Sequence, residues 1–437
     1  MGNVSVIGTG YLGATHAAAM AEAGHTVIGI DVDAARVDAL NRGEPPFFEP
    51  GLADLVKKHV ATGALSFSQD VTATAECDAH FLCVGTPQHA GSDAADLTHV
   101  HAAVAALAPV LTKPTLVIGK STVPVGTAQE LASTLARTAP AGDAVHLAWN
   151  PEFLREGHAI EDTLSPDRIV VGVMHASDER KLRDLYAAPI AAGTPFLSTD
   201  FATAELVKVA ANAFLATKVS FINAMAEVCE VTGADVTHLA EAIGHDDRIG
   251  PKFLRAGIGF GGGCLPKDIR AFGARAGELG VGPSLAFLRE IDEINTRRRH
   301  HTVEIAREML SRSILGARIA VLGVAFKPDS DDIRDSPALN IAAALHLQGA
   351  QVRVYDPRAN ANASRAFPTL NYAPDAESAL EGAHLVLLLT EWAEFLDLDP
   401  VLVAKMVESP VILDGRNALD AKLWRTAGWE YRGLGRR

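Results

Sequence analysis

Apolar and polar positions in the first thirty residues follow a strand–helix–strand pattern. The segment VSVIGTGYLGATHAAAMAEAGHTVIGID, from residue 4, shows an apolar strand, a glycine turn, an alanine-rich helix and a second strand that ends in Asp31. Further apolar runs at 79–84, 115–119 and 144–149 alternate with helical stretches, as in parallel strands covered on both faces. We therefore predict an αβα dinucleotide-binding domain at residues 1–197.

The pattern changes after this domain. From 203 to 244, and again from 284 to 310, apolar residues recur every three or four positions, which predicts long helices in a central connector at 198–314. At Ala317 the strand–helix–strand pattern returns with RIAVLGVAFKPD, SPALNIAAALHLQGA and QVRVYDP, which predicts a second αβα domain at 315–437. The expected fold is α/β, with two Rossmann-like domains joined by a long helical connector and an active site in the cleft between them.

Composition narrows the classes of function. Of 437 residues, 48% are hydrophobic and 21% charged, as in globular proteins, and no apolar run of membrane-spanning length or secretory leader is apparent. We expect a soluble, cytoplasmic protein. The net charge of −14 disfavours nucleic acid and anionic membranes as partners, so an anionic small molecule would need a locally basic pocket.

The cysteines favour thiol chemistry at one position. Cys77, Cys83, Cys229 and Cys264 form no CxxC pair and have no metal-ligand spacing, so we expect neither a disulfide framework nor a metal site. Cys264 lies in the glycine-rich loop GIGFGGGCLPKD, where the following proline fits a first helical turn. A helix N-terminus and a neighbouring lysine both lower a thiol pKa, which makes Cys264 a candidate nucleophile.

A glycine fingerprint indicates the cofactor. Gly8, Gly10 and Gly13 lie between strand and helix, where the backbone can approach a pyrophosphate. Asp31 could accept hydrogen bonds from the ribose hydroxyls and would repel a 2′-phosphate, which favours NAD over NADP. Arg36 leaves NADP open, because a nearby arginine can accommodate that phosphate.

Other polar motifs support either a site or ordinary structure. The loops VGTP, KSTVP and NPEFLREG follow strands at the carboxyl edge of the first sheet, where open α/β sheets bind ligands. Lys208 and Asn212 share one side of a helix, which could also be a solvated polar stripe. Asp268, four residues after Cys264, could face the thiol or stabilise the helix dipole. Six cationic side chains could together bind a diphosphate, although each alone could be a surface charge. They are Arg248, Lys252, Arg255, Lys327, Arg334 and Arg416.

The chain resembles the UDP-glucose 6-dehydrogenase family over almost its whole length. The segments that carry the resemblance are, in order, GTGYLG, VGTP, KSTVPVGT, NPEFLREG, the Lys208–Asn212 helix, RIGPKFLRAGIGFGGGCLPKD, GVAFKPDSDDIRDSP and DGRN. The resemblance implies a homodimer built on the central helix. It also implies NAD-dependent, four-electron oxidation of UDP-glucose to UDP-glucuronate. In that reaction Cys264 forms a thiohemiacetal and then a thioester, and water hydrolyses the thioester.

The resemblance also implies residue roles. Around the nucleophile Cys264 it places Lys208, Asn212 and Asp268, with Glu152 as acid/base for the thioester stage and Thr122 as a partner of a catalytic water. The cofactor positions are Gly8, Gly10, Tyr11, Leu12, Gly13, Asp31, Arg36, Gly85, Thr86, Pro87, Ser121, Thr122, Glu156, Lys267 and Arg334. The substrate positions are Glu152, Phe153, Leu154, Lys208, Asn212, Arg248 (from a neighbouring subunit), Lys252, Phe253, Arg255, Gly257, Phe260, Gly261, Cys264, Phe326, Lys327 and Arg416.

Several alternatives stay open. UDP-N-acetylmannosamine enzymes usually carry GGHC and GDP-mannose enzymes FAFGGSC, so IGFGGGCLPKD with the preceding RIG favours UDP-glucose. A two-electron hydroxy-acid dehydrogenase would have no use for a nucleophilic thiol, and a non-catalytic regulator would have no need to keep the polar set around it. The base for the first oxidation is either neutral Lys208 or a water held by Asp268 and Thr122.

Overall fold

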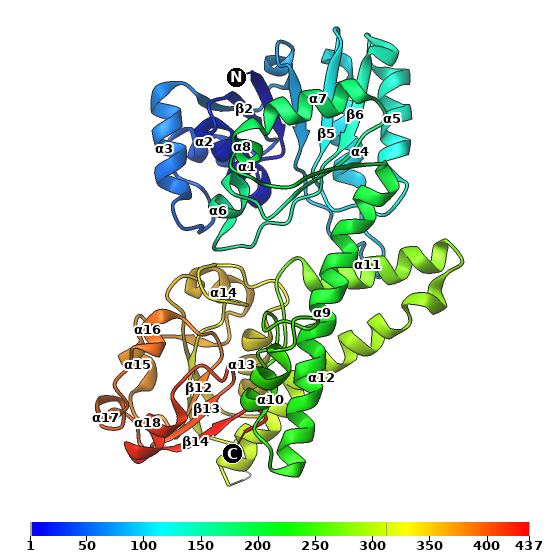
Figure 1. Ribbon diagram of the computed structural model, residues 1–437. Coiled ribbons are helices and arrows are strands. Elements are labelled where there is room, and N and C mark those ends of the chain that lie inside the picture. The colour runs from blue at the N-terminus through cyan, green and yellow to red at the C-terminus, as the bar shows by residue number, and fades with distance from the viewer. Residues whose placement is uncertain (1, 312, 437) are drawn as a thin grey trace. The chain divides into compact units, whose positions relative to one another are not determined.

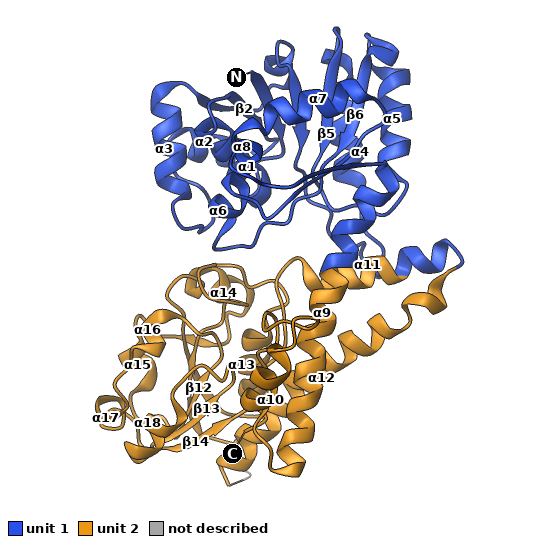
Figure 2. Ribbon diagram, in the orientation of Figure 1, with its two compact units in different colours: residues 1–211, 274–280 blue, residues 212–273, 281–437 orange. Residues whose placement is uncertain are grey.

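The computed structural model describes residues 2–311 and 313–436. The chain forms two compact units (Figure 2): Met1–Ala211 with Ala274–Gly280, and Asn212–Gly273 with Val281–Arg437. The predicted domain boundaries at 197 and 314 stay predictions.

An eight-stranded sheet forms the centre of unit 1. Its order is β3-β2-β1-β4-β5-β6-β7-β8, and all pairs are parallel except β6 with β7. The predicted runs at 79–84, 115–119 and 144–149 form β4, β5 and β6. The strands are β1 (Asn3–Ile7), β2 (Thr26–Ile30), β3 (Leu65–Ser68), β4 (Ala79–Leu82), β5 (Thr115–Gly119), β6 (Val145–Trp149), β7 (Ile169–Gly172) and β8 (Phe196–Thr199). Because the strand order reverses between β1 and β4, their carboxyl ends form a topological switch point, where such sheets bind ligands.

Helices cover both faces of this sheet (Figure 1). Successive side chains of β4 point to opposite faces of the sheet, so Phe81 packs in one hydrophobic core and Leu82 in the other. The helices are α1 (Tyr11–Glu22), α2 (Ala34–Asn41), α3 (Leu52–Thr62), α4 (Thr98–Leu107), α5 (Thr127–Thr138), α6 (Ala159–Leu164), α7 (Ala176–Leu185) and α8 (Ala187–Ala191), with 3-10 turns at Val71–Thr74, Ala108–Val110 and Gly142–Ala144.

The segment after the first sheet, predicted as a helical connector, consists mainly of helices. It comprises α9 (Phe201–Thr232), α10 (Val236–Gly244), α11 (Leu265–Glu278), the 3-10 turn Gly282–Leu285 and α12 (Phe287–Met309). The boundary between the two units falls within α9, after Ala211. Among the described residues, α9 alone is long and apolar enough to cross a membrane, but 44% of its most apolar stretch is buried and core helices pass the same test.

A six-stranded, wholly parallel sheet forms the centre of unit 2, in the order β11-β10-β9-β12-β13-β14. Its strands are β9 (Arg318–Leu322), β10 (Gln351–Tyr355), β11 (Asn371–Tyr372), β12 (Leu385–Leu388), β13 (Val411–Asp414) and β14 (Glu430–Gly433). Its helices are α13 (Pro337–Leu347), α14 (Asn360–Ala366), α15 (Ala376–Leu380), α16 (Ala393–Leu396), α17 (Pro400–Val403) and α18 (Ala421–Thr426). The predicted fold class, two Rossmann-like domains and a long helix, is confirmed.

Candidate active site

The glycine loop leaves open space at the start of α1. Gly8 has a φ of +87°, and a Cβ there would lie 2.7 Å from Val84. A Cβ on Gly13 would lie 1.8 Å from the carbonyl oxygen of Gly8, whereas one on Gly10 would meet nothing within 4 Å. Two glycines therefore let the backbone pack closely, and the third leaves room for a pyrophosphate at a helix N-terminus.

Asp31 and Arg36 form an ion pair beside this loop. Asp31 Oδ2 lies 2.9 Å from Arg36 Nη1 and accepts hydrogen bonds from the backbone and side chain of Thr9. Burial alone would raise the pKa of Asp31, but the bonds from Asp33, Thr9 and Arg36 outweigh it and hold the pKa below its ordinary value. The carboxylate is thus ionised. It is paired with Arg36, the residue whose presence leaves NADP possible as a cofactor in the sequence analysis.

Two further loops converge on the switch point. The Ser121 hydroxyl donates to the Val84 carbonyl at 2.6 Å, and the Thr86 hydroxyl donates to the Thr122 carbonyl at 2.8 Å. The VGTP and KSTVP loops, with Gly85 and Pro87, are therefore held together next to Gly8.

Glu152 faces Lys208 within unit 1. Glu152 Oε1 lies 2.8 Å from Lys208 Nζ, while Oε2 accepts the backbone N–H of Leu154 at 2.8 Å. The Phe153 ring centroid lies 5.7 Å from the same Nζ and 3.9 Å from the Arg168 guanidinium. The predicted acid/base residue and the predicted oxyanion-stabilising cation therefore form one buried pair.

Glu49, which no sequence motif indicates, holds the far end of the NPEFLREG loop. Its carboxylate accepts the backbone N–H groups of Gly157 at 2.7 Å and Ala159 at 2.6 Å, and the Tyr11 hydroxyl also donates to it. Burial and Glu49 raise the pKa of Tyr11 far above its ordinary value, so the phenol is a neutral donor. This buried glutamate joins the loop of Glu156 to the glycine loop.

Cys264 lies immediately before α11, with Pro266 in the first turn, as predicted. It is exposed, whereas the other three cysteines are buried, and burial raises the pKa of Cys77 to about 11 and of Cys83 to about 12. The Asp268 N–H donates to the Cys264 carbonyl at 2.9 Å. Cys264 is thus the accessible thiol, at the position where a helix N-terminus favours the thiolate.

Asp268 binds the amide that the sequence placed near the reacting carbon. Its Oδ2 accepts from Asn212 Nδ2 at 2.6 Å, and its Oδ1 lies 2.6 Å from Lys267 Nζ. The carboxylate is 2% exposed. The amide, the carboxylate and the cysteine loop are therefore brought together in unit 2, and Lys267 engages Asp268.

Three consecutive glycines hold the cysteine loop against the β9–α13 connection. A Cβ on Gly261 would lie 2.4 Å from the Asp335 carbonyl, on Gly262 2.9 Å from the Phe326 ring, and on Gly263 2.3 Å from the Arg334 guanidinium. Any larger residue would displace the loop. This packing explains why Phe326 and Arg334 lie beside the Cys264 segment.

The segment before the cysteine is clamped by Asn223 and Asn295, which the sequence did not single out, and the predicted residues Arg416 and Lys327 lie at the neighbouring Phe326. Asn223 accepts the Gly257 N–H at 2.8 Å, and Asn295 bonds both the N–H and the carbonyl of Phe260. Arg416, largely buried, donates to the Phe326 carbonyl at 2.9 Å, and Lys327 Nζ lies 5.5 Å from the Phe326 ring centroid. Arg416 also pairs with Glu391 at 3.4 Å, so this part of unit 2 is a fixed loop cluster that contains a paired cation.

Other predicted substrate residues lie on the surface. Arg248 is 89% exposed and is held by Asp246, and Arg255 is 66% exposed. Lys252 is exposed, and Phe253 has a strained φ of +65°. Arg255 nevertheless lies 3.7 Å from Glu391, which also pairs with Arg416 of the clamped loop, whereas Arg248 is held by Asp246. The roles of all the site residues stay predictions.

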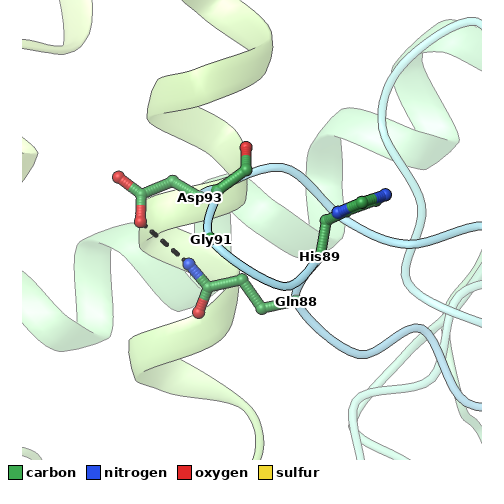
Figure 3. A pocket seen from close by; sticks show the side chains of 5 residues that line it. Gln88, His89, Gly91 and Asp93 are labelled. Carbon is green, nitrogen blue, oxygen red and sulfur yellow. Dashed lines mark hydrogen bonds between the residues drawn. The ribbon is translucent and has the colours of Figure 1, made fainter.

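Two features involve none of the predicted site residues. Figure 3 shows an open hollow on the loop 88–93, where Gln88 donates to Asp93 at 2.8 Å. His146, His175 and Asp178 form the one group of possible metal ligands among the described residues; His146 Nδ1 lies 2.7 Å from Asp178 Oδ1, an ordinary imidazole–carboxylate contact.

Domain models of one family match the chain in order. The UDP-glucose/GDP-mannose dehydrogenase NAD binding domain matches residues 2–190, the central domain 202–297 and the UDP binding domain 320–421. A UDP-glucose 6-dehydrogenase of Bacillus subtilis is 40% identical over 100% of this chain and 94% of its own, and one of Rhizobium meliloti is 41% identical over 99% of each.

Solved structures agree. A UDP-glucose dehydrogenase from Pyrobaculum islandicum superposes with a TM-score of 0.91 at 36% identity, covering 100% of this chain and 98% of that one. A UDP-D-ManNAc dehydrogenase from Pyrococcus horikoshii has a TM-score of 0.86 at 26% identity, covering 99% of each. The chain belongs to the UDP-glucose/GDP-mannose dehydrogenase family, as an NAD-dependent dehydrogenase of a UDP-sugar.

Proposed function

We propose that this chain oxidises the C6 alcohol of UDP-glucose to a carboxylate, giving UDP-glucuronate. The observation that carries the proposal is the exposed Cys264 at the start of α11, in a loop fixed beside the Asn212–Asp268 pair. A nucleophilic thiol is needed only when an aldehyde is oxidised further. The substrate is taken from relatives at 36–41% identity, which are named UDP-glucose 6-dehydrogenases.

NAD, when bound, would supply the hydride acceptor for each of the two oxidations. The open glycine loop, the ionised Asp31 and the joined VGTP and KSTVP loops would hold it. The clamped loop of unit 2, with Arg416 and Lys327, would bind the sugar nucleotide through its phosphates.

In the first stage the C6 hydroxyl loses its proton and the aldehyde forms. Lys208 and Asn212 are one turn apart on α9, so an ammonium and an amide can both reach one oxygen and stabilise its developing charge. The proton goes either to neutral Lys208 or to a water bound by Asp268 and Thr122.

In the second stage the Cys264 thiolate adds to the aldehyde carbon. A carbon–sulfur bond forms, and oxidation of this thiohemiacetal leaves a thioester. Glu152 takes a proton from water, the hydroxide adds to the thioester carbonyl, and the carbon–sulfur bond breaks to release the carboxylate and the thiolate. The Leu154 N–H and the Lys208 ammonium hold the Glu152 carboxylate in place.

The decisive experiment measures NADH released per mole of limiting UDP-glucose, with UDP-N-acetylmannosamine and GDP-mannose alongside. Two equivalents from UDP-glucose support the proposal. One equivalent would remove the thioester route, and activity only with another sugar nucleotide would move the substrate to a sister enzyme.

We also propose a homodimer formed through α9. Phe214, Phe221 and Val228 recur every seven residues and are 67%, 47% and 51% exposed. A seven-residue repeat places them on one face of the helix, and apolar stripes of this kind bury themselves against a partner. A second copy could also supply Arg248, which is held outward by Asp246.

Phe221→Glu should shift the protein from dimer to monomer in light scattering coupled to gel filtration. Leu423→Glu, at a site 53% exposed on α18, is the matched control and should leave the dimer intact. A dimeric Phe221→Glu protein would contradict this interface.

The cytoplasm is the proposed compartment, because the reaction consumes NAD and needs a reduced thiol.

A further inference from the structure

A buried lysine lies behind Glu152 that the mechanism above does not use. Lys120 follows β5 and is 7% exposed. Its Nζ lies 3.1 Å from Asn150 Oδ1, 3.4 Å from the Asn150 carbonyl and 3.5 Å from the Tyr186 hydroxyl. Its hydrogen-bond partners among the described residues are therefore all neutral oxygens, although a buried ammonium normally has an anion.

The Asn150 side chain makes three hydrogen bonds in this arrangement. Its Oδ1 accepts from Lys120 and, at 2.6 Å, from the Tyr186 hydroxyl, while its Nδ2 donates to the Val170 carbonyl at 2.8 Å. Its backbone N–H donates to the Gly119 carbonyl at 2.7 Å. Asn150 thus ties β5, β6 and β7 together, two residues before Glu152.

Around Lys120, the lysines outnumber the carboxylates. Glu152 lies within electrostatic range of Lys120 and forms its ion pair with Lys208, so two buried lysines share one carboxylate. Burial lowers the pKa of Lys120 to about 8, Cys83 and Glu152 act in the opposite direction, and Lys208 lowers it further. The groups that face it are His16 on α1, Cys83 after β4, Tyr186 after α7, Glu152 and Lys208.

Apart from Glu152, the titratable neighbours of Lys120 add no negative charge. Burial, then Lys120, lowers the pKa of His16, and neither ring nitrogen has a hydrogen-bond partner among the described residues. Burial raises the pKa of the Cys83 thiol to about 12 and that of Tyr186 far above its ordinary value. Glu152 is therefore the anion that Lys120 stabilises.

We infer that Lys120 is a positioning residue for thioester hydrolysis, which holds the Asn150–Glu152 turn, and with it the Glu152 carboxylate, in place. This inference rests on the proposed function. A base must lie close to the water whose proton it takes. Without Lys120, Asn150 Oδ1 loses one of its two donors, so the turn that carries Glu152 is held less firmly and hydrolysis slows.

The test follows the acyl-enzyme on Cys264. Enzyme, excess NAD and limiting UDP-glucose are mixed and acid-quenched, and intact mass reports the fraction of acylated protein over time and pH. For Lys120→Met and Lys120→Gln we expect the acyl-enzyme to persist ~10-fold longer than in the wild type, with little change in KM for UDP-glucose.

Two further variants test whether the bonds to Asn150 are responsible. Lys120→Arg keeps a cationic donor to Asn150 and should keep a near-wild-type acyl lifetime. Tyr186→Phe removes the second bond to Asn150 Oδ1 and should lengthen the acyl lifetime in the same direction as the neutral Lys120 variants. Having two neutral variants guards against one that does not fold, which circular dichroism detects.

The inference is overturned if a folded neutral variant keeps the wild-type acyl lifetime, or if Lys120→Arg lengthens that lifetime as much as the neutral variants do. The wild-type control distinguishes this from failure of the proposed function. Two equivalents of NADH and a detectable acyl-enzyme must be seen first; if they are absent, the function itself is wrong.

Discussion

Glu152 Oε1 lies 2.8 Å from Lys208 Nζ, with the two side chains 12% and 6% exposed. An ion pair so deeply buried is costly to break, because the remaining charge has no solvent to replace its partner. The pair therefore fixes the geometry of both groups. It also means that each residue is best tested by a substitution that keeps its shape.

Glu152→Gln should slow thioester hydrolysis while leaving the first oxidation largely intact. The amide can still occupy the site beside Lys208 but cannot accept a proton from water, so we expect kcat to fall ~10²–10⁴-fold with little change in KM. Rapid quench with mass detection should show acyl-enzyme on Cys264. Glu161→Gln, at a site 73% exposed, is the control, and equal loss there would contradict a specific role.

Cys264→Ser should lose the second oxidation selectively. Serine lacks a thiolate, so no thioester forms, and we expect less than about one-thousandth of wild-type uronate formation. Cys229→Ser, at a buried thiol whose pKa is raised by burial, should retain activity. Undiminished uronate formation by Cys264→Ser, measured by chromatography, would refute covalent catalysis.

Asp268→Asn should lower kcat in both oxidations. The carboxylate holds Asn212 at 2.6 Å, and its loss frees the amide that stabilises the oxyanion, which we expect to cost ~10²–10³-fold. Asp292→Asn is the matched control. Asp292 lies on α12 and pairs at 2.8 Å with Arg270, which lies on α11 as Asp268 does. A normal kcat for Asp268→Asn in stopped-flow measurements of NADH would show that the pair is structural only.

Asp31→Asn should weaken the preference for NAD over NADP. The substitution removes the negative charge that repels a 2′-phosphate and releases Arg36 to contact it, so the ratio of kcat/KM for the two cofactors should fall ~10–100-fold. Asp33→Asn, beside the same arginine, is the control. If the ratio is unchanged, Asp31 does not contact the ribose.

Glu230 should contribute stability that disappears in acid. Burial alone would raise its pKa, but the contacts with His301, Arg298 and the Gly435 N–H outweigh it and leave the pKa below the ordinary 4.5. A group with a lowered folded-state pKa stabilises the fold above its unfolded value and loses this effect as pH falls through the folded value. Glu230→Gln should cost about 2 kcal/mol at neutral pH and much less below pH 4.5, as thermal unfolding would show. A cost that does not vary with pH would contradict the linkage.

The sequence by itself determined the features that depend on local backbone geometry. Helix and strand periods predicted both Rossmann-like halves, because alternation and three-to-four spacing follow from the backbone alone. The glycine loop and the helix start after Cys264 were predicted for the same reason, since glycine freedom and the position of Pro266 are local constraints. Lys208 and Asn212 were placed on one helix side because they are four residues apart.

Only the tertiary structure decided which distant side chains meet. Asn212 and Asp268 are 56 residues apart, Lys120 and Asn150 are 30 apart, and Glu49 reaches Gly157 across 108. No local pattern marks such partners, because a buried polar side chain takes its role from the donors and acceptors that the packed core presents to it. Lys120 illustrates this: in sequence it is one residue of a strand-end loop, and only burial beside Asn150 lets it hold the turn that carries Glu152.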